Sequence, residues 1–597
     1  MRWNGRTLFG CVLLCAGLVF YLQSSGSLLS SCPRVVCPSH IPQSSRSPNY
    51  AAADEADLDL QNLHQIRCQI NAHRTVFCLK DSGQSEVYIP FFGFLKDYFE
   101  LTGKLHKERN SEQRPAFEWW HSYARLHKPP DSYSHVGVFG SFASYNVEGR
   151  DRVRCISGEH AVPMSVQWGS TPYYYPIQVA QYGLEHYSRN LTEENPVIIT
   201  VDSSVRSWQV PPDFASGAKI SQIAGPEPDS LAVRLESDAS LENPGYFLYL
   251  HSDPVHVVEL LMKLGANASL SVTVERLDTH EFLHLHYVQQ SDSQCVRQAS
   301  PQAFVYSLGV ASFLDQWRSF VRNILTDLNR ALAAAAVAAG ARKRRANQKP
   351  AKIPGDYLRL VSVGVRGVAE VMTGRVRQRS SAHLSQFLAA ADWLEKNQDE
   401  KGGWPVGVTR SLSKDKLVLP PGWYSAMAQG HAISVLCRAY HVTKLEKYLQ
   451  AAHKATALFQ VDASQGGVRN WFLEQTVWFE EYPTSPGTFV LNGFIYSLLG
   501  LFDLKSTQTD DGQTAKLYAE GVRSLKRLLP LFDTGSGSVY DLRHTSIDVP
   551  PNLARWDYHA VHIYQLWWMF VLEKEEVFKS YAERWTAYAR GERAKHN

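Results

Sequence analysis

Three stretches near the C-terminus concentrate residues that can move protons or hold an anion. They read "WFEEYPTSPGTFVLNG" from residue 478, "GSVYDLRH" from residue 537 and "RWDYHAVH" from residue 555. Carboxylates and tyrosines carry general acid–base chemistry, and arginines bind carboxylates in a bidentate fork. The side chains concerned are Glu480, Glu481 and Tyr482; Tyr540, Asp541 and Arg543; and Arg555, Asp557, Tyr558 and His559.

Each of these side chains also has a purely structural interpretation. Paired glutamates usually form a solvated face, an arginine beside an aspartate is usually an ion pair, and a tyrosine at a helix start usually packs. Their recurrence on successive loops favours a shared site instead. The sequence has no Ser/His/Asp order, P-loop, GxGxxG or metal signature, so nucleophilic, nucleotide and redox chemistry have no support.

A set of amphipathic helices must position these loops. After residue 380, apolar residues recur at i, i+3 and i+4 in segments such as "AHLSQFLAAADWLEKNQ" and "EVFKSYAERWTAYARG". Gly-rich turns at 402, 466 and 535 recur after about every two helices. This period predicts a toroid of helical hairpins. Asn492 and Tyr496 are four residues apart and share a helix face.

The segments before residue 380 favour strands. Residues 85–165 have β-hairpin texture, and residues 195–310 alternate like an antiparallel sandwich or barrel. Between them, "PIQVAQYGLEHYSRN" predicts a helix with Pro176 at its first position. Residues 328–352 predict an Ala-rich helix or linker ending in a basic run, Arg342–Arg345, which is also typical of a proprotein-convertase site or a polyanion contact.

The fold class predicted from these patterns is a multidomain α+β protein. With 597 residues the chain is too long for a single core, and 44% apolar with 20% charged residues is ordinary for a globular protein. The expected divisions are a signal anchor (1–24), a stem (25–84), a β-hairpin domain (85–165), a β-sandwich or barrel domain (166–355) and an (α/α) barrel domain (356–597).

The N-terminus predicts a membrane anchor. Arg2 and Arg6 precede the apolar run "LFGCVLLCAGLVFYL", and positive charge before such a run favours a cytoplasmic N-terminus. A cleaved signal peptide is the alternative. Two N-glycosylation sequons, at Asn190 and Asn267, agree with a body in the secretory lumen.

The nine cysteines fit no zinc pattern. Cys68 and Cys78 flank an alternating segment and predict a disulfide across a hairpin. Cys155, Cys295 and Cys437 are expected to be single buried thiols. The 28 Tyr and 15 Trp residues suit either large packed cores or a sugar-binding cleft, and the net charge of +3 does not select a ligand.

Long motifs make a family resemblance specific. "NQDEKGGWP", "PGWYSAMAQG", "FVLNGF-YSL-GL-DLK", "L-DTGSG--YDLRH", "PNLARWDYH--H", "YNVE-RDRV-CISG" and "Y-YPIQ-AQYGL-HYS-NLTE" resemble the heparan sulfate D-glucuronyl C5-epimerase family, in the same order, over residues 85–597. Members of that family invert C5 of D-glucuronate in N-sulfated heparosan to give L-iduronate, in heparan sulfate and heparin biosynthesis.

The resemblance implies roles for the loop residues. Glu481 and Tyr558 are expected across the sugar ring as base and acid, exchanging roles in the back reaction. Tyr482 and Tyr540 match further catalytic tyrosines. We expect Arg543 or Arg555 to lower the pKa of Tyr558 or to clamp the uronate carboxylate. The other implied substrate-binding residues are Tyr145, Arg150, Arg152, Gln167, Tyr175, Gln178, Gln181, Asn492, Tyr496, Asn552 and His559, and the loop "TRSLSKDK" matches only as far as Arg410.

The resemblance also implies a setting for the reaction. We expect a cleft between domains, a homodimer and a Golgi membrane protein of type II with a lumenal body. No catalytic cofactor and no nucleic-acid partner are expected, whereas a structural calcium ion in the β-region is compatible with the family, its ligands unplaced. A uronate polysaccharide lyase, which abstracts the same C5 proton, and a non-catalytic glycan-binding protein are the alternatives.

Overall fold

The computed structural model describes residues 63–70, 74–83, 85–91, 95, 101–107, 115–121, 126–240, 243–310, 313–338, 352–509 and 511–595. The chain forms two compact units, Met1–Tyr123 and Ala124–Asn597. The predicted anchor, the basic run Arg342–Arg345 and most of the predicted stem lie outside the described residues. Of the helices that are described, none is long and apolar enough to cross a membrane.

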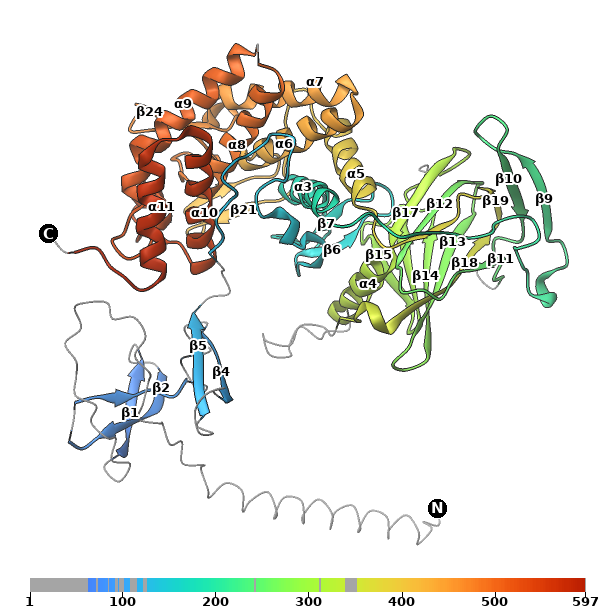
Figure 1. The fold of residues 1–597 in the computed structure, drawn as a ribbon, viewed down its shortest axis with the longest axis horizontal. Helices are drawn as coiled ribbons and strands as arrows, with labels where there is room; N and C mark the ends of the chain where they lie inside the picture. Colours follow the sequence, from blue (N-terminus) through green and yellow to red (C-terminus); the bar gives the residue numbers. More distant parts are fainter. Residues whose placement is uncertain are drawn as a thin grey trace, which may run out of the picture. The chain divides into compact units, whose positions relative to one another are not determined.

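The first unit consists of short antiparallel strands. Strands β1 (Leu63–Ile70), β2 (Arg74–Asp81) and β3 (Val87–Tyr88) form one sheet, and β4 (Leu101–Lys107) pairs with β5 (Pro115–His121) (Figure 1). A disulfide between Cys68 and Cys78 joins β1 to β2, which confirms the predicted hairpin link. Strands β1 and β2 lie within residues 25–84, which were predicted to form a stem. Low-complexity sequence dominates the first part of that segment and obscures the alternating pattern of the two strands.

The second unit contains a β-sandwich (Figure 1). Its first sheet has the order β8-β20-β12-β19-β10-β9, with β17 also paired to β12, and its second has the order β11-β18-β13-β14-β16-β15. The strands are β8 (Ile198–Thr200), β9 (Lys219–Ala224), β10 (Leu231–Glu236), β11 (Tyr246–Tyr249), β12 (Val257–Leu264), β13 (Ser269–Arg276), β14 (Glu281–Val288), β15 (Val296–Ser300), β16 (Ala303–Ser307), β17 (Arg318–Asn323), β18 (Leu358–Arg366), β19 (Val368–Met372) and β20 (Arg377–Arg379).

Alternating side chains form the core of this sandwich. Leu260 and Met262 on β12 point inward from one sheet, and Val272 and Val274 on β13 point inward from the other. The predicted antiparallel pairing holds throughout, except that β14 and β16 run parallel. Helix α4 (Ile324–Ala338) covers part of the Ala-rich segment and packs on the sandwich, where Tyr287 donates a 2.7 Å hydrogen bond to Asp327.

The rest of the second unit is helical (Figure 1). Its helices are α3 (Pro176–Thr192), α5 (His383–Lys396), α6 (Ala426–Thr443), α7 (Glu446–Ala455), α8 (Leu491–Thr507), α9 (Gly512–Leu528), α10 (Trp556–Glu573) and α11 (Glu576–Ala589). Short strands and 3-10 turns connect them: β6 (Val153–Ile156), β7 (Pro163–Ser165), β21 (Arg410–Leu412), β22 (Leu417–Leu419), β23 (Arg469–Phe472), β24 (Thr476–Phe479), β25 (Val539–Asp541), β26 (Asn552–Leu553), η3 (Phe142–Ser144), η4 (Val147–Gly149), η8 (Thr456–Gln460), η9 (Ala463–Gln465), η10 (Leu529–Phe532) and η11 (Arg543–Thr545). Two further 3-10 turns, η5 (Pro212–Phe214) and η7 (Gly355–Tyr357), belong to the sandwich region.

Helices α6 and α8 pack closely because each presents a glycine to the other. A Cβ on Gly430 would lie 2.5 Å from Ser497 Cα, and a Cβ on Gly500 would lie 2.5 Å from Gly430 Cα. The helical C-terminal region is therefore as predicted, and its closure into a toroid stays a prediction.

Helix α3 starts at Pro176 as predicted, but it packs with the helices. Sequence reasoning made it the leading helix of the β-domain. Instead Gly183 lies against Ala390 of α5 and Val435 of α6, at distances of 3.0 and 3.2 Å from its would-be Cβ. Residues 176–188 are buried on all sides, which requires neighbours on every face of the helix.

Several links join the helical domain to the sandwich, among them hydrogen bonds of Arg322 and a disulfide. Arg322 of β17 donates to the carbonyl oxygens of Ile156 and Ser157, at 2.8 and 2.7 Å, while its charge is paired with Asp327. A disulfide joins Cys155 to Cys295. The prediction that these two cysteines are single thiols was wrong, since spacing in sequence gives no sign of a pair 140 residues apart. Cys437 is unpaired and buried, as predicted.

Candidate active site

A cleft of about 170 Å³ lies inside the helical domain. It is lined by side chains from the η3–β7 region, from helices α3, α6, α8 and α10, and from the loop after β24. These are Tyr145, Arg150, Arg152, Gln167, Tyr175, Ile177, Gln178, Gln181, Met427, Glu481, Tyr482, Asn492, Tyr496, Tyr558 and Val561. None of the lining residues belongs to the strands of the sandwich, but they come from all three of the ranges 85–165, 166–355 and 356–597 that were predicted as separate domains.

The cleft brings together most of the polar residues predicted to bind substrate. Tyr145 and Tyr496 are about 350 positions apart in the sequence, yet their hydroxyls lie 2.8 Å from each other. Arg150 donates a 2.6 Å hydrogen bond to Gln181, and Arg152 donates to Gln167 at 3.2 Å. Burial, together with the nearby charge of Arg152, lowers the pKa of Arg150 to about 10. Two cations thus lie side by side in the cleft wall.

Several polar groups at the cleft are buried without a hydrogen-bond partner among the described residues. They are both amide atoms of Gln178, Oδ1 of Asn492 and Oε2 of Glu481. A buried polar group without a partner costs about 1–3 kcal/mol, so such groups rarely cluster by chance. Their convergence on one cavity indicates a place for a polar ligand.

Glu481 reaches the cleft because its neighbour Glu480 anchors the chain. The Glu480 carboxylate accepts hydrogen bonds from the backbone amides of Thr488 and Phe489, at 3.0 Å each, and from the Thr488 hydroxyl at 2.9 Å. This fixes the turn after β24, and the next side chain faces the cavity. Of the two glutamates, Glu480 therefore has the structural role and Glu481 is the one at the site.

Burial raises the pKa of Glu481 to about 7. Hydrogen bonding to Tyr482 and the charge of Arg410 act in the opposite sense. Arg410 lies over the Trp168 ring, 4.5 Å from its centre, and 5.4 Å from the centre of the Tyr482 ring. A carboxyl group with such a pKa can accept and release a proton near neutral pH.

The tyrosines around Glu481 are held neutral. Burial raises the pKa of Tyr558, and the negative charge of Glu481 raises it further. Burial likewise raises the pKa of Tyr482 and of Tyr540 well above the ordinary value. The rings of Tyr540 and Tyr558 meet edge to face with centres 4.7 Å apart. Arg555 does lower the pKa of Tyr558, as expected, and Arg152 acts in the same sense, but burial and the charge of Glu481 outweigh both arginines.

The structure places five predicted residues outside the cleft lining, and the first of them, Tyr540, packs on the lining residue Tyr558. Arg543 donates to Asp541 at 2.8 Å and to Ser413 at 2.9 Å, and Asn552 donates to the same aspartate at 2.8 Å. His559 binds Ser538 and the Trp585 carbonyl. Arg555 is exposed, pairs with Asp557 at 2.9 Å and lies 5.7 Å from the Tyr558 ring centre.

The arginines that line the cleft are Arg150 and Arg152, not Arg543 or Arg555. Sequence reasoning missed Ile177, Met427 and Val561, which line the cavity with apolar surface. Their helical spacing marked them only as core residues. Within the described parts of the chain, no group of three or more His, Cys, Asp or Glu side chains is arranged to hold a metal ion.

Comparison with known proteins gives consistent matches. Residues 398–587 match the family described as "D-glucuronyl C5-epimerase C-terminus", and residues 231–367 match "D-glucuronyl C5-epimerase, beta-sandwich domain". The chain is 42% identical to the D-glucuronyl C5-epimerase of Caenorhabditis elegans over 576 residues, which cover 89% of this chain and 90% of that protein. It is also 32% identical over 171 residues to an uncharacterized protein of Methanocaldococcus jannaschii, covering 28% of this chain and 53% of that protein.

Proposed function

The chain belongs to the D-glucuronyl C5-epimerase family and is an epimerase, and from this premise we propose that it converts D-glucuronate to L-iduronate within N-sulfated heparosan. The observation that carries the mechanism is the Glu481 carboxyl group, which is buried in a cleft beside neutral tyrosines and two arginines and has a pKa of about 7. Side chains in this cleft supply the base, the acid and the cations that a two-sided proton transfer needs, so the proposed steps involve no cofactor.

The first step removes the C5 proton of glucuronate. This proton is α to a carboxylate and weakly acidic, so the base must be close and the developing enolate must be stabilised. Glu481 in its ionised form takes the proton, and the electron pair of the C–H bond moves into the carboxylate. Arg150 and Arg152 neutralise the charge that accumulates on the carboxylate oxygens, since both arginines line the cleft.

The second step returns a proton to the opposite face. Tyr558 is protonated at neutral pH and donates its hydroxyl proton to C5, which gives the inverted configuration. A single base would return the proton to the side from which it came. In the back reaction the Tyr558 phenolate is the base and protonated Glu481 the acid.

The site must then restore its starting protonation state. After one turnover Glu481 carries the extra proton and Tyr558 lacks one. Glu481, a carboxyl group of pKa about 7, releases its proton to water, and the Tyr558 phenolate, whose pKa is raised, takes a proton from water before the next turnover. Tyr540 is placed to assist, because it packs on Tyr558 and interacts with Glu481.

We predict that Glu481→Gln and Tyr558→Phe each lower the rate of epimerisation by about 10²–10⁴-fold, the usual contribution of a general acid or base. Neither change alters the shape of the cleft much, so N-sulfated heparosan should bind nearly as before. The measurements are C5 exchange in deuterated water and the Kd for the polysaccharide. Exposed Glu400→Gln and Tyr357→Phe are matched controls. Normal epimerisation by either site variant would show that its assignment is wrong.

The pH dependence follows from the direction of the Glu481 shift. Since the base must be ionised, kcat/KM for glucuronate conversion should fall about tenfold per pH unit below a pKa of about 7 and level off above it. Arg410→Gln removes a charge that lowers this pKa, so the acid limb should move to higher pH, whereas Arg410→Lys should leave it nearly in place. If kcat/KM of the unmodified enzyme instead began to fall only at pH 4–5, the assignment of Glu481 as the base would be contradicted.

Because Gly493 of α8 has no side chain, it leaves the space that the side chain of Glu481 occupies. A Cβ at this position would lie 2.5 Å from Oε2 of Glu481 and 2.7 Å from its Cβ. Gly493→Ala should therefore displace the carboxylate and lower kcat by roughly 10²-fold, the cost of a misplacement of about 1 Å. Alanine favours the helix by about 1 kcal/mol, so helix propensity does not explain a loss.

The matched control is Gly512→Ala at the start of α9, where a Cβ would meet nothing within 4 Å. It should retain full activity. Unchanged kcat in Gly493→Ala, with an unchanged melting temperature, would mean that the position of Glu481 is not critical.

We further propose that the enzyme is a homodimer anchored in the Golgi membrane with its body in the lumen. The glycosylation sites fit this orientation, because Asn190 and Asn267 are both exposed. On protein made in animal cells, treatment with an N-glycosidase should lower the mass by two glycans, and Asn190→Gln or Asn267→Gln should each remove one. Protein with no glycan at either position would argue against lumenal exposure.

A further inference from the structure

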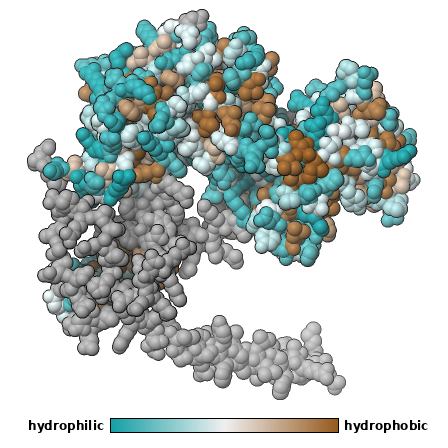
Figure 2. Space-filling view, viewed as in Figure 1, coloured by the Kyte–Doolittle hydropathy of each residue, from teal (hydrophilic) through white to brown (hydrophobic). Residues whose placement is uncertain are grey.

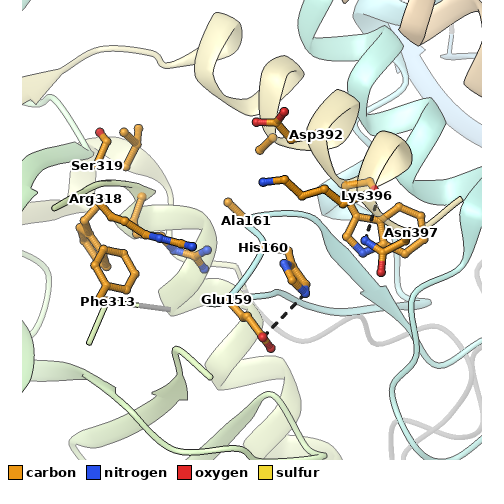
Figure 3. Close-up of a pocket in the computed structure, with 15 residues that line it drawn as sticks. Glu159, His160, Ala161, Phe313, Arg318, Ser319, Asp392, Lys396 and Asn397 are labelled. Atoms are coloured by element: carbon orange, nitrogen blue, oxygen red, sulfur yellow. Dashed lines mark hydrogen bonds and ion pairs between the residues drawn. The ribbon is translucent and has the colours of Figure 1, made fainter. Parts of the chain in front are cut away.

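A second and larger cleft, of about 390 Å³, lies where the helical domain meets the sandwich. Three elements form it: the turn between β6 and β7, strand β17, and the C-terminal part of α5. Figure 3 shows Arg318 reaching in from β17 and Lys396 reaching in from α5, with His160 between them on the β6–β7 turn. The proposed mechanism uses none of these residues.

Of the three arginine and lysine side chains that line this cleft, Arg322 is paired with Asp327, whereas neither Arg318 nor Lys396 forms an ion pair with another residue in the part of the chain that the structure describes. Burial lowers the pKa of His160, Glu159 acts in the opposite sense, and the charges of Lys396 and Arg318 lower the pKa further. Of the two acids at the cleft, Asp392 is already paired with Lys447 at 2.9 Å, and Glu159 lies 3.9 Å from His160.

The remaining lining suits a sugar rather than a bare ion. Asn397 and Ser319 are exposed and supply groups that form hydrogen bonds, whereas Trp393 and Phe313 are largely buried, at 7% and 5% exposure. The polar groups can bind the hydroxyls of a sugar, while the cations bind its carboxylate or sulfate groups. The volume is within the usual range for small-ligand sites. On the face seen in Figure 2 the surface is mostly hydrophilic, with hydrophobic residues in separate patches.

The β6–β7 hairpin connects this cleft to the first one. Arg152, which lines the first cleft, precedes β6, and Glu159 lines the second cleft at the turn that follows. These residues are seven positions apart, so their Cα atoms are separated by at most about 25 Å. A polysaccharide of several sugar units spans that distance.

We propose that this second cleft, lined by Arg318, Lys396, His160 and Trp393, is a remote binding site for an anionic sugar unit of the same polysaccharide whose glucuronate reacts at Glu481. This proposal rests on the proposed function, because it takes the polysaccharide as the ligand. It makes the enzyme prefer long chains: occupation of both clefts adds binding energy that a short oligosaccharide does not gain. The site acts on affinity alone and leaves the chemical step unchanged.

The test uses N-sulfated heparosan oligosaccharides of increasing length, from tetrasaccharide to dodecasaccharide, with the full-length enzyme. The double variant Arg318→Gln/Lys396→Gln removes both unmatched cations, and Lys401→Gln, an exposed lysine just beyond α5, is the matched control. Kd is measured for each length, and KM and kcat for the shortest and longest. Affinity of the unmodified enzyme should rise with length, and the double variant should lose about tenfold affinity for the dodecasaccharide and little for the tetrasaccharide.

Two results would overturn the remote site. One is a Kd that does not depend on length in the unmodified enzyme, and the other is the same length dependence in the double variant. A fall in kcat on the tetrasaccharide would also contradict it, because the cleft would then affect catalysis. Failure of the proposed function would look different: no oligosaccharide would be epimerised by the unmodified enzyme, whatever the binding of the variants.

Discussion

The architecture depends on keeping one ionisable carboxyl group, that of Glu481, away from bulk water and yet within reach of a sugar. Burial destabilises the ionised carboxylate relative to the protonated acid, and this desolvation raises the pKa of Glu481 to about 7. The neighbouring groups limit the shift. Arg410 and the hydroxyl of Tyr482 favour the ionised form, whereas Asp541 disfavours it. The balance suits a group that must release its proton and regain it in each turnover.

The surrounding structure holds this carboxyl group in place. Glu480 fixes the turn that carries it, and the absence of a side chain at Gly493 leaves room beside α8. Helix α3 and the η3–β7 region complete the opposite wall with two arginines and a set of amides. The sandwich contributes no residue to that cleft, but Arg322 and the Cys155–Cys295 disulfide tie it to the β6–β7 hairpin that links the two clefts.

Much of this could be predicted from the sequence. Hydrophobic periodicity placed the helices and strands, and Pro176 marked the start of α3. The motifs pointed to residues that meet in the cleft although they are hundreds of positions apart, such as Tyr145 and Tyr496. The predictions that failed concern which residues contact one another in the folded protein. Arg543 is only three residues from Tyr540, yet Asp541 and Ser413 bind its side chain, which does not line the cleft. The domain membership of α3 and the pairing of Cys155 likewise depend on distant contacts that local patterns do not encode.

The central claim is that Glu481 and Tyr558 move protons on opposite faces of C5 without cleaving the chain. The most direct measurement is incubation of the unmodified enzyme with N-sulfated heparosan in deuterated water, followed by nuclear magnetic resonance at C5 and by ultraviolet absorbance. The account predicts L-iduronate that carries deuterium at C5, with no new unsaturated chain ends. Iduronate that retains the original hydrogen, or cleavage with unsaturated ends, would contradict it.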